Sequence, residues 1–304
     1  MVGRGAPQVV TNLAVDVVAI FGPTASGKSP VAARVAGELG TEVVSADALQ
    51  VYRSLPILTN QPADPARLVG IRDLCDTMSV GEYSTLAHKA IDDLVRVHTI
   101  AVVAGGTGLY LRAALAELGI PPSVDSSERG RLEQLYDADR DQAHARLVEL
   151  DPAAAASVHV NDRRRVVRAL ELAETGSTLS PADGQLWSRA TRKPTLIVGL
   201  DVPTEELNRR IAERTDEMIR RGVVDEVREA MRGRVSHTAR KALGLEELAS
   251  LPLGEAREQL VARTRRYAAY QRKWMRRIPG IVMIDADRPT EQVADAVLDL
   301  ARAR

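Results

Sequence analysis

Short apolar runs, separated by stretches with helical spacing, follow one another along the chain. The residues from Ala14 to Phe21 form a nearly continuous apolar run that ends at a Gly-Pro pair. Such a run is typical of a strand that is buried on both faces of a parallel sheet. Alternating strands and helices predict a doubly wound α/β core with right-handed crossovers. Similar apolar runs lie at residues 42–45, 100–104, 196–200 and 281–285.

The pattern changes between residues 121 and 194. Arg, Glu, Ala and Leu recur there at helical spacing, and no strand pattern is evident. We therefore expect a helical insertion domain at residues 121–194, between a first part of the core at residues 1–120 and a second part at residues 195–304. From Glu205 to Trp274 the chain is again mostly helical, so the second part carries helices near its C-terminal end.

The composition is that of a folded protein with a balanced charge. Of the 304 residues, 45% are hydrophobic, and 41 Lys and Arg residues balance 41 Asp and Glu residues. A balanced chain has no long-range field that would draw the whole protein to nucleic acid or to a membrane, so any basic site must be local. The single cysteine, Cys75, allows no internal disulfide, and we expect it to be buried or half-buried as a small apolar residue.

The sequence contains no segment that predicts contact with a membrane. The first thirteen residues lack the apolar run of a signal peptide, and no stretch approaches the ~18 apolar residues of a membrane span. The lone cysteine also suits a reducing compartment. We therefore expect a cytoplasmic protein without membrane contact, acting as a monomer.

A phosphate-binding loop follows the first predicted strand. Its sequence GPTASGKS matches the pattern G-x-x-x-x-G-K-[ST], with a strand before it and a helix after it. The backbone N–H groups of such a loop converge on phosphate oxygens at a helix N-terminus. Lys28 adds a positive charge, and the Ser29 hydroxyl can hold a phosphate-bound Mg²⁺. The loop consists of Gly22, Pro23, Thr24, Ala25, Ser26, Gly27, Lys28 and Ser29.

This loop predicts a phosphorylated ligand but leaves the reaction open. The chain has no Asn-Lys-x-Asp segment, which argues against a GTPase, and residues 102–106 carry no acidic pair, which argues against a motor ATPase. A small-molecule kinase and a transferase that uses a diphosphate both fit. The predicted fold is an α/β fold, a P-loop doubly wound parallel sheet with an inserted helical domain and a mostly helical C-terminal region.

Two further segments lie where the ligand of such a sheet binds. Asp47 comes just after the second predicted strand, at the carboxyl edge of the sheet. Its carboxylate could cap a helix, hold magnesium or act as a base. A second glycine-rich turn, residues 105–111, follows the third strand and could bring the Thr107 hydroxyl to the same ligand.

Taken in order, these motifs resemble the signatures of bacterial tRNA dimethylallyltransferases. The resemblance spans roughly residues 15–285 and also includes residues 161–171, Arg210 to Val227 and Thr264 to Trp274. It implies an enzyme that moves a dimethylallyl group from dimethylallyl diphosphate to N6 of adenosine 37, beside the tRNA anticodon. The alternatives are a P-loop small-molecule kinase and a non-catalytic tRNA-binding relative.

The resemblance also implies roles for individual residues. Asp47 matches the general base of the family, Thr107 its active-site threonine and Arg214 a diphosphate-binding arginine, while Lys28 and the loop hold the diphosphate with Mg²⁺ at Ser29. The residues that match tRNA contacts are Asp47, Ala48, Leu49, Gln50, Arg164, Arg165, Arg168, Arg240, Gln271, Arg272, Trp274 and Arg276.

Two basic clusters are consistent with a nucleic-acid partner, and they are equally typical of helix faces exposed to solvent. One is Arg163 to Arg165 with Arg168, and the other places seven basic and three aromatic residues between Arg263 and Arg277. Such mixtures neutralise phosphates and stack on bases, but they also occur on solvated helix faces. The resemblance favours tRNA for both clusters.

Overall fold

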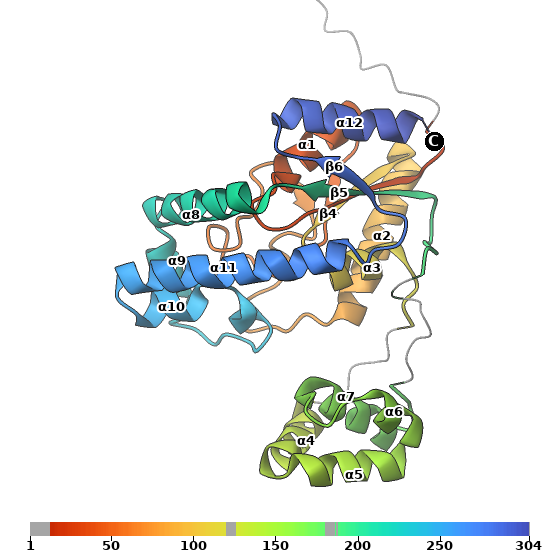
Figure 1. The fold of residues 1–304 in the computed structure, drawn as a ribbon, viewed down its shortest axis with the longest axis vertical. Coiled ribbons are helices and arrows are strands. Elements are labelled where there is room, and N and C mark those ends of the chain that lie inside the picture. The colour runs from red at the N-terminus through yellow and green to blue at the C-terminus, as the bar shows by residue number, and fades with distance from the viewer. Residues whose placement is uncertain (1–12, 120–125, 180–185, 187, 304) are drawn as a thin grey trace, which may run out of the picture. The chain divides into compact units, whose positions relative to one another are not determined.

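The computed structural model describes residues 13–119, 126–179, 186 and 188–303, which form two compact units (Figure 1). The first unit combines the chain up to Ala116 with the chain from Thr191 onwards, and the second unit is Glu117–Ala190. Our sequence analysis set the helical insertion at residues 121–194. The residues tested for a signal peptide lie, apart from Leu13, outside the described part of the chain.

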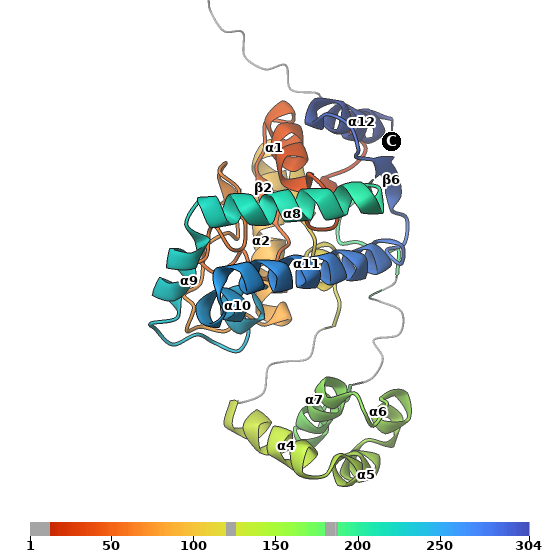
Figure 2. The same ribbon diagram turned by 60° about the vertical axis from the view of Figure 1, so that its left-hand side comes forward.

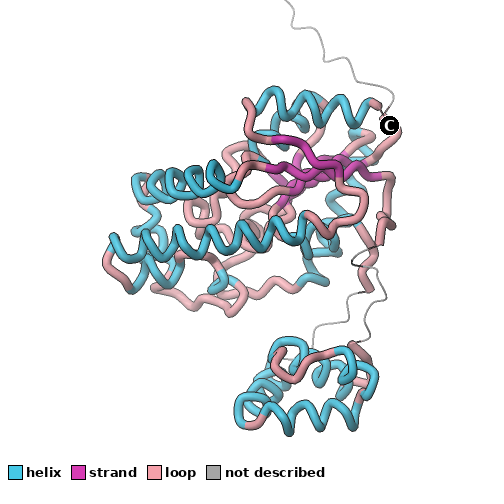
Figure 3. Tube along the Cα trace, in the orientation of Figure 1, coloured by secondary structure: helices cyan, strands magenta, loops and turns pink. Residues whose placement is uncertain are grey.

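The first unit is built on a six-stranded sheet with the order β3-β2-β4-β1-β5-β6, in which every neighbouring pair is parallel (Figure 3). This sheet confirms the predicted α/β fold class. The strand β3 was not predicted, because two half-buried residues carry no hydrophobic pattern. The strands are β1 (Val17–Phe21), β2 (Val43–Ser45), β3 (Ala66–Arg67), β4 (Ala101–Gly105), β5 (Thr195–Asp201) and β6 (Val282–Asp285).

The central strand β1 explains why the first apolar run is almost uninterrupted. All five of its residues are buried, because β4 and β5 flank it and helices cover both of its faces. Its last residue, Phe21, lies in register with Gly105 of β4 and Gly199 of β5. The loops after β1, β2 and β4 therefore leave the sheet at one edge, which is where open α/β folds bind ligands.

Helices cover both faces of the sheet. The helices α1 and α12 pack together on one face, and α2 and α3 pack together on the other, while α8 and α11 lie side by side (Figures 1 and 2). The helices of this unit are α1 (Lys28–Glu38), α2 (Val80–His98), α3 (Gly108–Leu115), α8 (Thr204–Arg220), α9 (Val223–Ala230), α10 (Leu245–Ser250), α11 (Leu253–Met275) and α12 (Thr290–Arg302), with a short 3-10 turn, η2 (Ala239–Lys241).

Among its described residues, the second unit contains helices joined by loops and turns, and no strand. Three of its helices begin at aspartates, Asp139, Asp151 and Asp162, whose carboxylates accept hydrogen bonds from the free N–H groups of the first turn. Its own core contains Leu132, Leu147 and other buried apolar side chains. The helices are α4 (Ser126–Ala138), α5 (Arg140–Leu150), α6 (Pro152–Ser157) and α7 (Arg163–Glu174).

Two expectations about the environment of the chain can be compared with the structure. Cys75 is exposed, so the expectation that it is buried was wrong. The residue lies in the loop between β3 and α2, where its thiol contacts the carboxylate of Asp76 instead of the core. Among the described residues, no helix combines the length and the apolar character that a membrane crossing requires.

Candidate active site

The loop after β1 has the conformation of a phosphate cradle. Gly27 adopts a left-handed φ of 82° immediately before α1, so the chain curls back onto the helix N-terminus. Ser26 is 1% exposed, and its Oγ has no hydrogen-bond partner among the described residues. Because buried hydroxyls are normally paired, this orphaned group suggests that the loop is shaped for a ligand.

Two cationic side chains meet at the cradle. Lys28 Nζ donates to the Pro23 carbonyl oxygen at 3.3 Å, and Arg214 of α8 donates to Thr24 Oγ1 at 2.8 Å. Burial lowers the pKa of Lys28 to about 8, a shift that the charge of Asp47 opposes and that of Arg214 reinforces. Burial also lowers the pKa of Arg214. Among the charges that affect these two buried cations, Asp47 is the one that opposes their desolvation, so an anionic ligand would be favoured beside them.

The lowered pKa of Lys28 predicts how ligand affinity changes with pH. An anionic ligand beside Lys28 would be held by the protonated ammonium group, so we expect its affinity to be full well below pH 8 and to fall as the pH rises through about 8. The loss can reach about tenfold for each further pH unit, because one proton is then taken up on binding. Binding titrations with dimethylallyl thiolodiphosphate between pH 7 and 9.5 measure this change in affinity. The diphosphate of the ligand is almost fully ionised at pH 7, so its own titration contributes little. Lys28→Ala should abolish the dependence, and a flat wild-type profile would contradict it.

Asp47 lies just beyond β2, next to the cations. Its Oδ1 accepts a hydrogen bond from the Leu49 N–H at 3.0 Å, which fixes one carboxylate oxygen. The neighbouring Ala48 N–H donates to Thr107 Oγ1 at 3.4 Å, so the second glycine-rich turn supports this segment. Tyr267 of α11 lies on the same side: burial, with the charge of Asp47, raises its pKa to about 12, and hydrogen bonding with Thr107 has the opposite effect.

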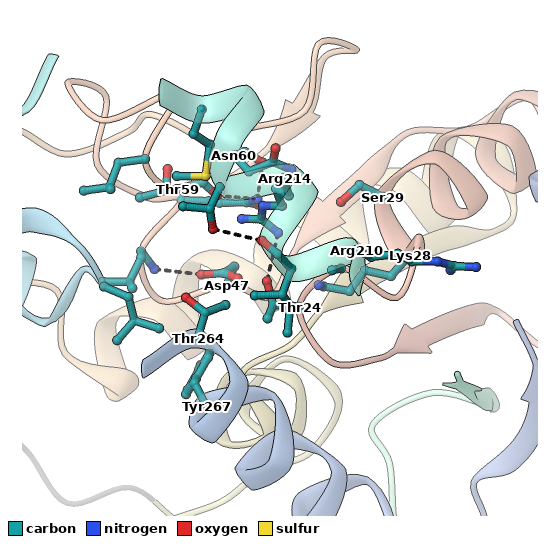
Figure 4. A pocket seen from close by; sticks show the side chains of 18 of the residues that line it. Thr24, Lys28, Ser29, Asp47, Thr59, Asn60, Arg210, Arg214, Thr264 and Tyr267 are labelled. Atoms are coloured by element: carbon teal, nitrogen blue, oxygen red, sulfur yellow. Dashed lines mark hydrogen bonds between the residues drawn. The ribbon is translucent and has the colours of Figure 1, made fainter. Parts of the chain in front are cut away.

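These groups surround one pocket of about 340 Å³, which is shown in Figure 4. Its lining is partly polar and partly apolar. Lys28, Ser29, Asp47 and Arg214 contribute polar and charged groups to the lining, and several apolar side chains contribute the rest of its surface. A ligand with an anionic head and an apolar tail fits such a lining. The apolar part includes Leu49, Leu58, Ile211, Met218, Ala242, Leu243 and Leu260.

Gln271 of α11 connects the two glycine-rich loops by hydrogen bonds. Its Oε1 accepts a hydrogen bond from the Thr24 N–H and its Nε2 donates to the Gly106 carbonyl oxygen, both at 2.8 Å. The side chain is 3% exposed. A Cβ at Gly106 would lie 2.3 Å from Gln271 Nε2, and one at Gly108 would lie 2.3 Å from the Trp274 ring, so both glycines are needed for α11 to approach.

Comparison with known proteins places this pocket in a family. Residues 50–278, about three quarters of the chain, match the family model described as IPP transferase. The chain belongs to the IPP transferase family. It is 40% identical to a tRNA dimethylallyltransferase of Streptomyces coelicolor over 279 residues, covering 87% of this chain and 88% of that protein. Its identity to a tRNA dimethylallyltransferase of Thermobifida fusca is 37% over 292 residues, covering 90% of this chain and 91% of the other.

The fold is similar to that of a solved dimethylallyltransferase. The structure is a eukaryotic dimethylallyltransferase acting on tRNA, which matches with a TM-score of 0.74 and 26% identity over 95% of this chain and 80% of that one. The arrangement of sheet and helices is therefore that of the family whose motifs the sequence resembles, and the predicted family and fold are confirmed.

The expected tRNA-contact residues of the first unit differ widely in their surroundings. The Gln50 amide accepts from Ser45 Oγ and donates to the Asn60 carbonyl oxygen, so both of its ends are hydrogen-bonded within the protein, like those of Gln271. Arg272 donates to Asp201 and Thr204, and Arg240 pairs with Glu246 at 3.4 Å. Gln50 and Gln271 both line the pocket, with their amides held by hydrogen bonds within the protein.

Other expected contacts of the first unit lie nearer the solvent. Arg276 is exposed, and its guanidinium has no hydrogen-bond or ion-pair partner among the described residues. Trp274 is half-buried and lies edge-on to Tyr270, with 6.5 Å between the ring centroids. An unpaired arginine and a neighbouring aromatic ring are the groups that nucleic acids contact most readily.

The basic cluster of the second unit lies on α7. Arg165 is 68% exposed and approaches only Asp162, and Arg164 is exposed without a partner in the described part of the chain. Arg168 is different, because its guanidinium donates to Glu171 at 2.9 Å, a carboxylate that is 1% exposed. The three arginines therefore divide into two that face the solvent and one that is held by the core of the unit.

Proposed function

We propose that this chain is a tRNA dimethylallyltransferase that transfers the dimethylallyl group of dimethylallyl diphosphate to N6 of adenosine 37 and releases diphosphate. The observation that carries the proposal is the single pocket in which a cationic cradle, a carboxylate and an apolar lining meet. The cradle suits the diphosphate and the apolar side chains suit the five-carbon tail. A nucleoside triphosphate would instead place its polar sugar and base against leucine and methionine side chains.

The donor complex follows from these contacts. The loop N–H groups, Lys28 and Arg214 would bind the diphosphate, and the orphaned Ser26 hydroxyl would donate to one of its oxygens. Each methylene that leaves water for the apolar part contributes about 0.8 kcal/mol. The tail therefore adds affinity while the head determines orientation.

Asp47 is proposed as the general base. The exocyclic N6 of adenine is a weak nucleophile because its lone pair is conjugated with the ring, so removal of a proton as the new C–N bond forms lowers the barrier. The prenyl carbon gains allylic cation character as the C–O bond to diphosphate breaks. Lys28 and Arg214 stabilise the charge that collects on the departing diphosphate, and Thr107 holds the Asp47 segment in place.

The residues present also fit Mg²⁺. Among the described residues no cluster of three or more His, Cys, Asp or Glu side chains could hold a metal alone. Magnesium in phosphate sites is usually held by one or two protein oxygens together with the phosphates, and Ser29, whose hydroxyl could be such a ligand, lines the pocket. The ion would neutralise the diphosphate as it departs.

The proposed acceptor is the anticodon loop of tRNA. A stacked adenine cannot reach a carboxylate at the bottom of a pocket, so the base must be extruded from the loop. Exposed arginines on α7 and at the end of α11 would bind the surrounding phosphates. Because the proposed substrate is tRNA, we also propose that the protein acts in the cytoplasm, and that it acts as a monomer.

Salt dependence tests the proposed phosphate contacts. Alanine at any two of Arg165, Arg168, Arg272 and Arg276 should weaken tRNA binding, and each lost contact should reduce the slope of log affinity against log salt by about 0.7 to 0.9. Arg164→Ala with Arg276→Ala should show the clearest change, because neither side chain has a partner to lose among the residues that the structure describes. Equal slopes for wild type and variants would mean that these arginines only solvate helix faces.

Labelled donors separate the proposal from its alternatives. We expect transfer of labelled dimethylallyl to bulk tRNA but not to AMP, and no transfer of the γ-phosphoryl group of ATP to small hydroxyl acceptors. A kinase would show the opposite pattern. A non-catalytic relative would bind tRNA and leave the label on the donor.

A further inference from the structure

A loop that forms one wall of the pocket is held in place by a carboxylate outside the proposed catalytic groups. The wall loop, Leu55–Gln61, contributes Leu58, Thr59 and Asn60 to the pocket lining (Figure 4). The N–H groups of Ile57 and Leu58 donate to the two carboxylate oxygens of Glu226 on α9, both at 2.8 Å. One side chain thus fixes two consecutive residues of the wall.

The rest of the wall loop is also held by hydrogen bonds. Its first residue, Leu55, is fully buried, and the Thr59 N–H donates to the Leu55 carbonyl oxygen at 3.0 Å, which closes a single helical turn. At the other end, Gln50 Nε2 donates to the Asn60 carbonyl oxygen at 3.0 Å. The two N–H groups at the start of this turn have no partner within the turn, so Glu226 supplies the acceptors that they need.

The wall is tightly backed on its apolar side. Gly244 adopts a φ of 94°, and a Cβ there would lie 3.1 Å from Leu58 Cδ1 and 3.0 Å from both methyl groups of Leu260. Leu58 is 5% exposed and Leu260 is 3% exposed. Leu58 therefore packs closely against the backbone at Gly244 and beside Leu260, so its side chain has little free space around it.

We infer that Glu226 is a positioning residue that limits the length of the prenyl tail which the pocket accepts. The inference rests on the proposed prenyl donor. Each methylene added to a ligand increases its affinity for an apolar pocket, unless the wall cannot move to make room for it. Discrimination against a longer prenyl tail therefore depends on how rigidly the wall is held. Glu226 holds the wall loop at Leu58, the side chain that the tail would meet.

Binding of three unreactive ligands tests this inference. The ligands are inorganic diphosphate, dimethylallyl thiolodiphosphate and geranyl thiolodiphosphate, whose tail is five carbons longer. Wild type should bind the dimethylallyl compound at least about tenfold more tightly than the geranyl compound. Glu226→Gln replaces one acceptor oxygen with an NH2 group, so the dimethylallyl compound should bind about tenfold more weakly and the difference between the two tails should shrink to a few-fold.

Controls separate positioning from general support of the fold. The affinity for inorganic diphosphate should not change in Glu226→Gln, because the head group binds at the cradle. Glu229→Gln changes a carboxylate of the same helix that is 71% exposed, and it should resemble wild type. Leu58→Ala shortens the wall with Glu226 intact and should admit the geranyl compound. Glu226→Asp, which is too short to reach both N–H groups, should give an intermediate ratio and serves if Glu226→Gln does not fold.

The outcomes distinguish this inference from the proposed function. Three results would overturn the inference. The first is a ratio of dimethylallyl to geranyl affinity that does not change in Glu226→Gln, and the second is an equal loss of affinity for all three ligands in that variant. The third is a wild type that binds both tails equally well. If the wild type binds the dimethylallyl compound more tightly than the geranyl compound but transfers no prenyl group to tRNA, the proposed function is refuted. The inference that Glu226 limits the length of the tail would still stand.

Discussion

Asp47→Ala is expected to lower kcat for prenyl transfer by about 100- to 10,000-fold, the range for loss of a positioned general base. Binding of dimethylallyl diphosphate should stay within a few-fold of wild type, because two effects of the lost carboxylate oppose each other. An anion would no longer be repelled by Asp47, but the pKa of Lys28, which Asp47 raises, would fall further and leave less of the ammonium form. Single-turnover transfer to tRNA and separate donor titrations measure the two effects.

Two further variants control this prediction. Asp47→Asn keeps the size of the side chain and an oxygen for the Leu49 N–H but removes the basic carboxylate, so it should be nearly as inactive as Asp47→Ala. Asp64→Asn changes an exposed aspartate in a loop and should be fully active. Turnover near the wild-type value in Asp47→Asn would eliminate this residue as the base.

Lys28→Ala is expected to reduce both donor affinity and turnover, with a loss of about 100- to 1000-fold in kcat. The ammonium group lies at the cradle both before and during departure of the diphosphate, so it contributes to the ground state and, more strongly, to the transition state. Donor titration together with single-turnover rates separates the two contributions. Lys89→Ala removes an exposed lysine of α2 and is the matched control. Wild-type affinity together with wild-type turnover would show that the loop is only structural.

The sequence predicts the polar part of this site better than its apolar part. Lys28 is found because it belongs to the glycine-rich loop motif that follows β1, and Asp47 because it comes two residues after β2, at the edge where the parallel strands end. The apolar wall gives no such signal. Leu58, Leu243 and Leu260 lie in a loop, in a turn and on α11, and only the fold brings them together.

Side chains that support the site from a distance are also invisible in the sequence. Glu226 bonds to the N–H of Ile57, which is 169 positions away in the chain. Gln271 matches a tRNA contact by sequence, yet α11 packs so closely on the glycine-rich turns that its amide is buried between them. A sequence motif predicts which residues belong to the site. Which of their side chains point into the pocket depends on how α8, α9 and α11 pack.

The central claim is most directly tested by the product of one reaction. The protein would be incubated with dimethylallyl diphosphate and an unmodified tRNA that carries adenosine at position 37, or the same tRNA with guanosine there, and the digested nucleosides weighed by mass spectrometry. We predict an adenosine that has gained one dimethylallyl group in place of one hydrogen, in the first tRNA alone, with one diphosphate released for each. Absence of that nucleoside from the first tRNA, while the protein still binds the donor, would contradict the account.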